Sequence, residues 1–287
     1  AQGHDVIGYL PRPRQAKMWS YQGIAHGCSS LMYFRYRGAT KGAEQYCYGI
    51  IDQDNVKRRK FYEVQSFFKE MKENEALTQS EVKSDVAVVY DYESMASFRI
   101  QRQSFLMDYK QEVYRLYRPF YKKNINMDVI PSDSDFDKYK VLLLPVMIVH
   151  KKEVQDKVRK FVSGGGTVVF TYRTAVKDYY NNLTLGQFNP TYYTDLVGGY
   201  VEEVESFQDD QVAFLIGNED FEGINGTATV FRDMLKTTTA KTLFKYEDEF
   251  FEDLAAVTLN EYEGGKVYYI GSGADNTIMD AITNKII

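Results

Sequence analysis

The stretch KVLLLPVMIVHKKEVQDKVRKFVSGGGTVVFTY, residues 140–172, decides the fold. A continuous apolar run at 140–149 contains a strand, residues 151–166 form a helix that three glycines bring to an end, and residues 167–172 are a second apolar strand. Strands that are apolar throughout are typical of a parallel sheet with helices on both faces. The stretch therefore predicts one strand–helix–strand unit of an α/β sheet.

The same alternation extends toward the N-terminus as far as Val86. Residues 86–90 (VAVVY) and 125–130 (INMDVI) are predicted strands, and a long tyrosine-rich helix is predicted between them at 101–123. The pattern indicates a doubly wound, flavodoxin-like sheet. After Arg173 we expect a long loop at 174–200, β-like pieces at 211–216, 227–231 and 242–246, and a hairpin at 255–272.

The first part of the chain has a different pattern. We expect a loop at 1–13, a helix at 14–26, a buried strand at 30–36, a loop at 37–54 with a short helix around Glu44, and an amphipathic helix at 56–77. The polar stretch 78–85 then marks a boundary. Two domains are predicted, at 1–77 and 85–287.

Composition limits the possible partners and compartment. With 35 Lys and Arg against 40 Asp and Glu, the 287-residue chain has a net charge of −5 and no basic stripe, which argues against nucleic acid. No window approaches 18 consecutive apolar residues, and no signal peptide is visible, so neither a membrane partner nor export is expected. Two cysteines without a disulfide pattern favour a cytoplasmic location.

Neither a metal nor a cofactor is predicted. Cys28 and Cys47 are not spaced as metal ligands, either with each other or with a histidine. The SGGGT stretch at 163–167 follows a helix and precedes a strand, which is the reverse of a phosphate-binding loop. The α/β part contains no cysteine, so an amidotransferase nucleophile is not expected there.

One stretch suggests a pocket wall. Residues 31–50, LMYFRYRGATKGAEQYCYGI, carry an aromatic run and paired arginines, and a glycine-containing loop then presents Glu44. Glycosidases need two carboxylates flanking the scissile bond, so Glu44 alone can bind sugar hydroxyls but cannot run that mechanism. Glu44 could also be an ordinary loop residue.

Residues 14–51, RQAKMWSYQGIAHGCSSLMYFRYRGATKGAEQYCYGII, resemble glycoside hydrolase family 42, the β-galactosidases. They are similar to the end of that family's (β/α)8 barrel, where the aromatic–Arg motif lies on the eighth strand. The later stretches YKVLLLPVMIV, FVSGGGTVVFTYRT and GGKVYYIGS resemble its second domain, a flavodoxin-like (class I amidotransferase-like) α/β unit that mediates trimerisation.

The resemblance implies roles for four residues. Phe34 would pack on galactose, Glu44 would accept hydrogen bonds from its hydroxyls, Arg37 would orient acidic neighbours, and Cys47 stands near the place of a histidine that assists substrate binding in many members. The sequence departs from the family where Tyr36 replaces a common Trp, and where Gly3 and His4 replace an Asn-Trp pair. Both catalytic glutamates are expected upstream of Ala1, so no catalytic residue is assigned in this chain.

The predicted function is that of part of a β-galactosidase. The parent would hydrolyse terminal β-D-galactosides with retention, and this chain would supply subunit association as a homotrimer and one wall of the galactose site, inactive alone. The alternative is a free-standing, non-catalytic α/β module that binds sugar or protein. An enzyme that acts through the α/β sheet itself is a third reading, but it lacks a nucleophile.

Overall fold

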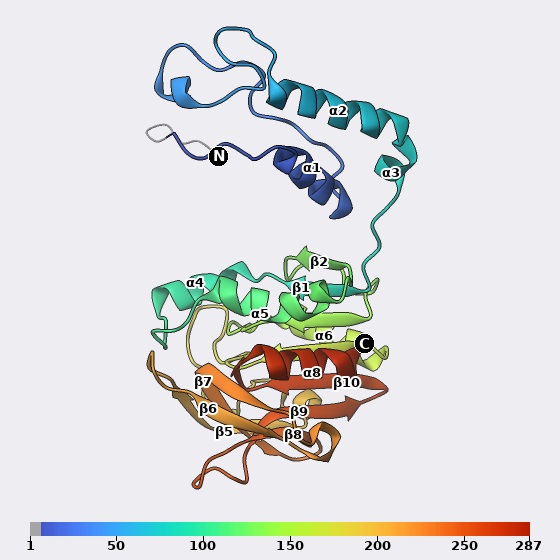
Figure 1. Cartoon of the computed structure of the whole chain (residues 1–287). Coiled ribbons are helices and arrows are strands. Elements are labelled where there is room, and N and C mark those ends of the chain that lie inside the picture. The colour runs from blue at the N-terminus through green and yellow to red at the C-terminus, as the bar shows by residue number, and fades with distance from the viewer. Residues whose placement is uncertain (1–6) are drawn as a thin grey trace. The chain divides into compact units, whose positions relative to one another are not determined.

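The computed structural model describes residues 7–287, so Gly3 and His4 lie outside the described residues. The chain divides into two compact units between Lys83 and Ser84, inside the polar stretch 78–85. Figure 1 shows both, and each is described here by itself. Across residues 7–287, every helix is too short or too polar to cross a membrane.

A parallel sheet forms the centre of the second unit. Its order is β2-β1-β3-β4-β10, and each neighbouring pair runs parallel. This is the flavodoxin-like order, with the fifth strand contributed by β10, and it confirms the predicted fold class. The strands are β1 (Val86–Val89), β2 (Met127–Ile130), β3 (Val141–Leu144), β4 (Thr167–Thr171) and β10 (Gly265–Ile270).

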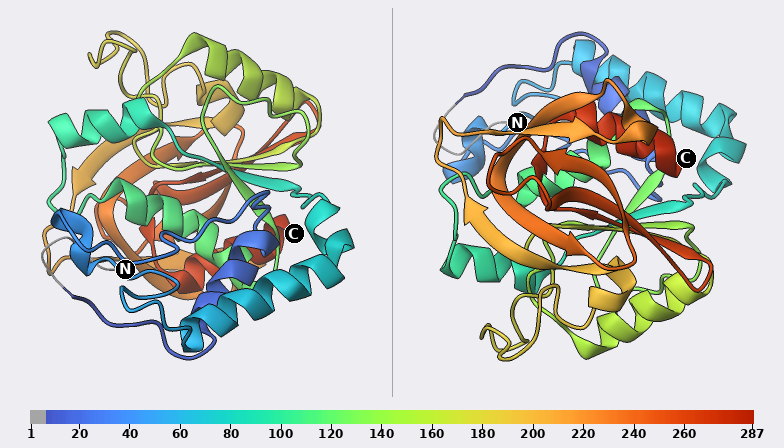
Figure 2. Two further views of the ribbon diagram at one scale, coloured as in Figure 1. Left: turned by 90° about the horizontal axis from the view of Figure 1, so that it is seen from above. Right: turned by 90° about the horizontal axis from the view of Figure 1, so that it is seen from below.

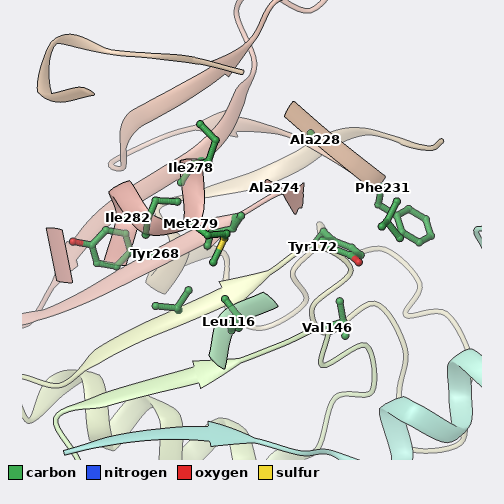
Figure 3. Close-up of a cluster of buried hydrophobic side chains, with 14 of the residues drawn as sticks. Leu116, Val146, Tyr172, Ala228, Phe231, Tyr268, Ala274, Ile278, Met279 and Ile282 are labelled. Atoms are coloured by element: carbon green, nitrogen blue, oxygen red, sulfur yellow. The ribbon is translucent and has the colours of Figure 1, made fainter. Parts of the chain in front are cut away.

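Helices cover both faces of this sheet. Alternate residues of β1 point to opposite sides: Val88 joins a core with α5 and α8, whereas Val89 joins a core with α6. Figure 3 shows the first of these cores, in which Ile278, Met279 and Ile282 of α8 lie around Tyr268 of β10. The helices are α4 (Tyr92–Ile100), α5 (Tyr109–Lys122), α6 (Lys152–Ser163), α7 (Thr194–Val197) and α8 (Asn276–Ile286).

The three glycines after α6 end the helix, as predicted. Gly165 has a φ of 91°, a left-handed conformation that favours glycine. Its N–H donates to the Val162 carbonyl at 2.9 Å, and the Gly166 N–H donates to the Phe161 carbonyl at 3.0 Å. These bonds satisfy carbonyls at the end of the helix and turn the chain into β4.

An antiparallel extension continues the sheet beyond β10. β9 pairs with β10 as the predicted hairpin, and β7 pairs with β5, β6, β9 and β11. Strands β6, β7, β8 and β9 therefore close on one another, and Figure 2 shows their strong curvature in orange and red. The strands are β5 (Gly199–Ser206), β6 (Ala213–Gly217), β7 (Asn225–Thr237), β8 (Lys241–Tyr246), β9 (Ala255–Tyr262) and β11 (Ser272–Ala274), with a short 3-10 helix, η2 (Glu219–Phe221), after β6.

The predicted helix at 101–123 is wrong at its start. Residues 101–108 are not helical, and the helix begins only with α5 at Tyr109; a separate helix, α4, ends before the predicted range, and each helix has its own side-chain cap. The Asp91 carboxylate accepts from the Ser94 N–H at 3.0 Å and begins α4, and the Asp108 carboxylate accepts from the Lys110 N–H at 3.0 Å and begins α5. The predicted loop at 174–200 also needs correction, because it contains α7 and the first residues of β5.

The first unit contains α1 (Gln15–Ala25) packed on α2 (Arg59–Glu73). Tyr21 and Phe67 meet edge to face at 5.3 Å, and Lys17 of α1 pairs with Glu70 of α2. Hydrogen bonds from Lys17, Tyr21 and Ser66 lower the pKa of Glu70 to about 2. The unit also contains η1 (Ala43–Tyr46) and α3 (Glu75–Gln79).

The buried strand predicted at 30–36 is wrong. The segment is extended and its residues alternate in exposure, but Met32, Phe34 and Tyr36 lie on the exposed side. A strand needs a neighbour to take its backbone groups. Within the described part of this unit, residues 35–38 make three backbone hydrogen bonds with residues 50–51. These form one isolated β-bridge, between Arg37 and Ile51, and not a strand pair.

A buried carboxylate joins the carboxyl ends of the parallel strands. Asp91, after β1, is completely buried and accepts from Ser132 Oγ at 2.7 Å and from Lys151 Nζ at 2.5 Å. Burial works to raise the pKa of Asp91, but hydrogen bonds from Lys151, Ser94 and Ser132 outweigh burial and lower it. The carboxylate is therefore ionised in the folded state.

Val88→Ala should lower the free energy of unfolding by about 2 kcal/mol, because two buried methyl groups lose their packing. Urea denaturation measures this change. The matched control is Val129→Ala, since Val129 is the register partner of Val88 on β2 but is 58% exposed. The control should stay within about 0.5 kcal/mol of the wild type. Equal losses of unfolding free energy in the two variants would contradict the burial of Val88 in the core on one face of the sheet.

Asp91→Asn should cost about 3 kcal/mol at neutral pH, because Lys151 keeps its buried charge and loses its buried partner. The pKa of Asp91 is lowered by folding, so this difference should be complete above about pH 4, the pKa of an unfolded aspartate. It should then decrease progressively as the pH falls from there through the lowered pKa of the folded state. Urea denaturation over a pH series measures it. Glu93→Gln, which removes the exposed partner of Lys151, should cost less than about 1 kcal/mol at any pH. A constant Asp91→Asn difference down to pH 3 would show that the charge is unimportant.

Candidate functional site: an aromatic and charged wall in the first unit

The candidate site lies where the extended segment 31–37 meets the loop that carries η1. Arg35 Nη1 donates to Glu44 Oε2 at 3.0 Å, and both side chains are partly exposed. The Arg35 guanidinium also lies 5.2 Å from the centre of the Phe34 ring. Phe34, Arg35 and Glu44 therefore form one continuous surface, which we call the Phe34–Glu44 wall.

Backbone hydrogen bonds hold this wall in place. The Ile50 N–H donates to the Arg35 carbonyl at 2.7 Å, and the Ile51 N–H donates to the Tyr36 carbonyl at 2.8 Å. Gly49 makes this approach possible, because a Cβ there would lie 2.6 Å from the Gly38 nitrogen. These contacts bring together the two ends of the loop that contains η1, so η1 lies close to Arg35. Glu44 is in the first turn of η1.

Phe34 presents its ring to solvent. The residue is 72% exposed, so the ring is open to contact from solvent. A sugar ring packs its C–H face on such an aromatic surface, and adjacent polar groups hold its hydroxyls. The Phe34–Glu44 wall offers both features, with Glu44 as the acceptor and Arg35 as the donor.

Arg37 and Cys47 lie beside this wall in different settings. Arg37 Nη1 donates to Asn55 Oδ1 at 3.3 Å, and both residues line a surface hollow of about 690 Å³ together with Arg35, Tyr36 and Ile51. Cys47 is a half-buried free thiol, and its N–H donates to the Glu44 carbonyl at 3.0 Å. Arg35 makes the contact with Glu44. The family resemblance assigned a role to Arg37 and none to Arg35, and the role of Arg37 in orienting acidic neighbours stays a prediction.

The wall can bind a polyhydroxylated ligand but cannot cleave it alone. Glu44 is one carboxylate, and a glycosidase needs an acid and a nucleophile or base on opposite sides of the bond. Among residues 7–287, no group of three or more His, Cys, Asp or Glu side chains is arranged to hold a metal ion.

The α/β unit presents no nucleophile at the turn after β3. This turn contains Pro145 and Val146, and Val146 has a φ of 40° with a completely buried apolar side chain. At the carboxyl edge, a hollow of about 310 Å³ is lined by Lys151 together with Tyr90 and Ser132. Lys151 Nζ already donates to Asp91, Glu93 and Ser132, so its three protons are engaged.

Comparison with known proteins places both units in one family. The family model described as "Beta-galactosidase trimerisation domain" matches residues 84–287, and the model described as "Beta-galactosidase" matches residues 3–74. The chain belongs to the β-galactosidases of glycoside hydrolase family 42. β-Galactosidase BgaA of Clostridium cellulovorans is 32% identical over 279 residues, which cover 96% of this chain and 41% of BgaA.

Solved structures of this family agree with the fold. The β-galactosidase of Bacillus circulans sp. alkalophilus aligns with a TM-score of 0.90 at 26% identity, over 96% of this chain and 42% of that one. A catalytic mutant of Gan42B, a GH42 β-galactosidase from G. stearothermophilus, gives 0.89 at 28% identity, over 96% and 40%. This chain therefore spans about two fifths of the length of these relatives.

If the Phe34–Glu44 wall serves binding, Phe34→Ala should leave the free energy of unfolding within about 0.5 kcal/mol of the wild type, because the ring is solvated. The matched variant Phe67→Ala should cost about 3 kcal/mol or more, because Phe67 is 1% exposed and packs between α1 and α2. Urea denaturation monitored by far-ultraviolet circular dichroism compares the two. A cost at Phe34 similar to that at Phe67 would assign Phe34 to the core.

Proposed function

We propose that the chain is the C-terminal part of a β-galactosidase that hydrolyses terminal β-D-galactosides with retention. Residues 1–77 contribute the end of the catalytic barrel, and residues 85–287 form the trimerisation domain. The observation that carries the proposal is the 32% identity to a β-galactosidase over 96% of this chain, across both units. The parent enzyme is proposed to act as a cytoplasmic homotrimer without a metal or cofactor, and without nucleic acid or membrane partners.

The Phe34–Glu44 wall is proposed as one side of the galactose site. Phe34 packs against the apolar face of the sugar, and Glu44 accepts hydrogen bonds from its hydroxyls. Arg35 orients Glu44 through the 3.0 Å contact. Arg37 and Cys47 border the same site, and Arg37 orients the polar groups around the neighbouring hollow. The acid/base and nucleophile glutamates are assigned to the parent and not to these residues, so the isolated chain should not cleave galactosides.

A chimera tests the proposal. The portion of the Clostridium cellulovorans enzyme that precedes its match to this chain is joined to residues 1–287, and hydrolysis of a chromogenic β-galactoside is measured. The chimera should be active, whereas residues 1–287 alone should be inactive. Glu44→Gln in the chimera should lower kcat/KM by about 10- to 100-fold, because a charge-assisted hydrogen bond to the sugar is lost.

Glu73→Gln is the matched control. Glu73 lies at the end of α2 with an exposed side chain and a loose contact of 3.8 Å to Lys69. Its removal should leave kcat/KM unchanged. A folded chimera that does not hydrolyse the substrate would overturn the proposed activity, and an active chimera that is indifferent to Glu44→Gln would remove Glu44 from the site.

A further inference from the structure

We propose that Asp233 is an uncharged carboxylic acid in the folded α/β unit, and that its proton is a pH-sensitive latch on the contact between β7, β10 and the turn after β4. Loss of this proton as the pH rises should destabilise the unit. Asp233 belongs to β7 and is 1% exposed. It lies inside one unit and is assigned no part in the proposed hydrolysis.

Asp233 connects three parts of the unit. Its Oδ2 accepts from the Arg173 N–H at 2.7 Å, in the turn after β4, and from the Tyr269 hydroxyl of β10 at 2.8 Å. Its backbone N–H donates to the Gly271 carbonyl at 2.7 Å, and a Cβ at Gly271 would lie 2.3 Å from the Asp233 carbonyl oxygen. β7 therefore passes directly against the link from β10 to β11.

The other carboxyl oxygen of Asp233 has no partner. Oδ1 is buried, and no donor among residues 7–287 reaches it. The Arg173 guanidinium donates instead to Gln103 Oε1, at 2.8 and 3.1 Å. Arg232 precedes Asp233 in β7, so its side chain leaves from the opposite face of the strand, where it pairs with two other carboxylates. A buried carboxylate with an unsatisfied oxygen is costly, whereas a neutral acid there lacks only one hydrogen bond.

The groups that face Asp233 do not compensate a negative charge. Tyr172 precedes Arg173, the Tyr246 hydroxyl of β8 donates to the Asp233 carbonyl at 3.1 Å, and Tyr269 donates to the side chain. Burial raises the pKa of all three tyrosines, so each stays uncharged. Burial also raises the pKa of Asp233, and it outweighs the charge and N–H of Arg173 and the hydroxyl of Tyr269.

Asp91 is the opposite case in the same unit, although both aspartates are completely buried. Asp91 accepts on both carboxyl oxygens, from Ser94, Ser132 and Lys151, and one of these donors is a cation. Asp233 accepts on one oxygen only, from two neutral donors. Equal burial therefore leaves Asp91 ionised and Asp233 protonated, because their donors differ.

The direction of the pH dependence follows from the raised pKa. Above about pH 4, the folded state holds a proton on Asp233 that the unfolded state has released. The stability that this proton contributes is complete below that pH and is lost as the pH rises through the pKa of the folded state. Within this window, one proton raises the unfolding equilibrium constant by up to about tenfold per pH unit.

Asp233→Asn tests the latch, because the amide keeps the shape and the accepting oxygen of a neutral acid. Urea denaturation of the full chain is measured over a pH series for the variant and the wild type. The ratio of their unfolding constants, wild type over variant, should be constant below about pH 4. Above that value it should rise by up to about tenfold per pH unit, since only the wild type can ionise at this position.

Infrared spectroscopy reads the protonation state directly and keeps the test decisive if Asp233→Asn does not fold. The wild type should retain a protonated-carboxyl band above about pH 5, where exposed carboxyl groups are ionised. The same band should persist in Asp91→Asn, and a folded Asp233→Asn should lack it.

Asp91→Asn is the matched control, since it makes the same substitution at an equally buried aspartate. It should act in the opposite direction, with the variant less stable than the wild type above about pH 4. For Asp233→Asn, a ratio that does not change with pH, or that changes in the direction of Asp91→Asn, would overturn the proposal. A wild-type spectrum without a protonated-carboxyl band above about pH 5 would overturn it as well.

Discussion

The geometry of the α/β unit depends on the ionised carboxylate of Asp91. This buried side chain accepts from the Ser94 N–H in the first turn of α4, from Ser132 after β2, and from Lys151 before α6. The Asp91 N–H also donates to the Tyr109 hydroxyl at 2.8 Å. Burying a charge is costly unless it is paired and hydrogen-bonded, and here three donors offset the cost. One side chain therefore fixes how two helices leave the carboxyl edge of the sheet.

The same network limits what this edge can do chemically. In open α/β sheets, ligands bind outside the carboxyl ends of the strands, where the strand order reverses. Here that position is between β1 and β3, and the protons of Lys151 are all committed to neighbouring acceptors. The turn after β3 presents the apolar side chain of Val146 to the core. The polar groups at this edge thus serve architecture.

The elements predicted most accurately from the sequence are the strands that consist of a continuous apolar run. β1, β3 and β4 lie within their predicted ranges, because a strand buried on both faces needs apolar residues at every position. The start of α5 was missed because it depends on one capping side chain, Asp108, within an otherwise helical pattern. The buried strand at 30–36 was predicted wrongly because an apolar and aromatic run does not reveal whether the backbone has a hydrogen-bonding neighbour.

The candidate site, like the fold, was predicted from the sequence only in part. The sequence predicted a polar and aromatic surface at residues 31–50, because residue type and order suffice for that. It could not predict that Arg35 contacts Glu44, since this depends on which way the side chain leaves an extended segment. Residues 35–38 make three backbone bonds to residues 50–51, where a full ladder would make more. The Arg35–Glu44 ion pair is therefore an additional contact between this segment and the loop that carries η1.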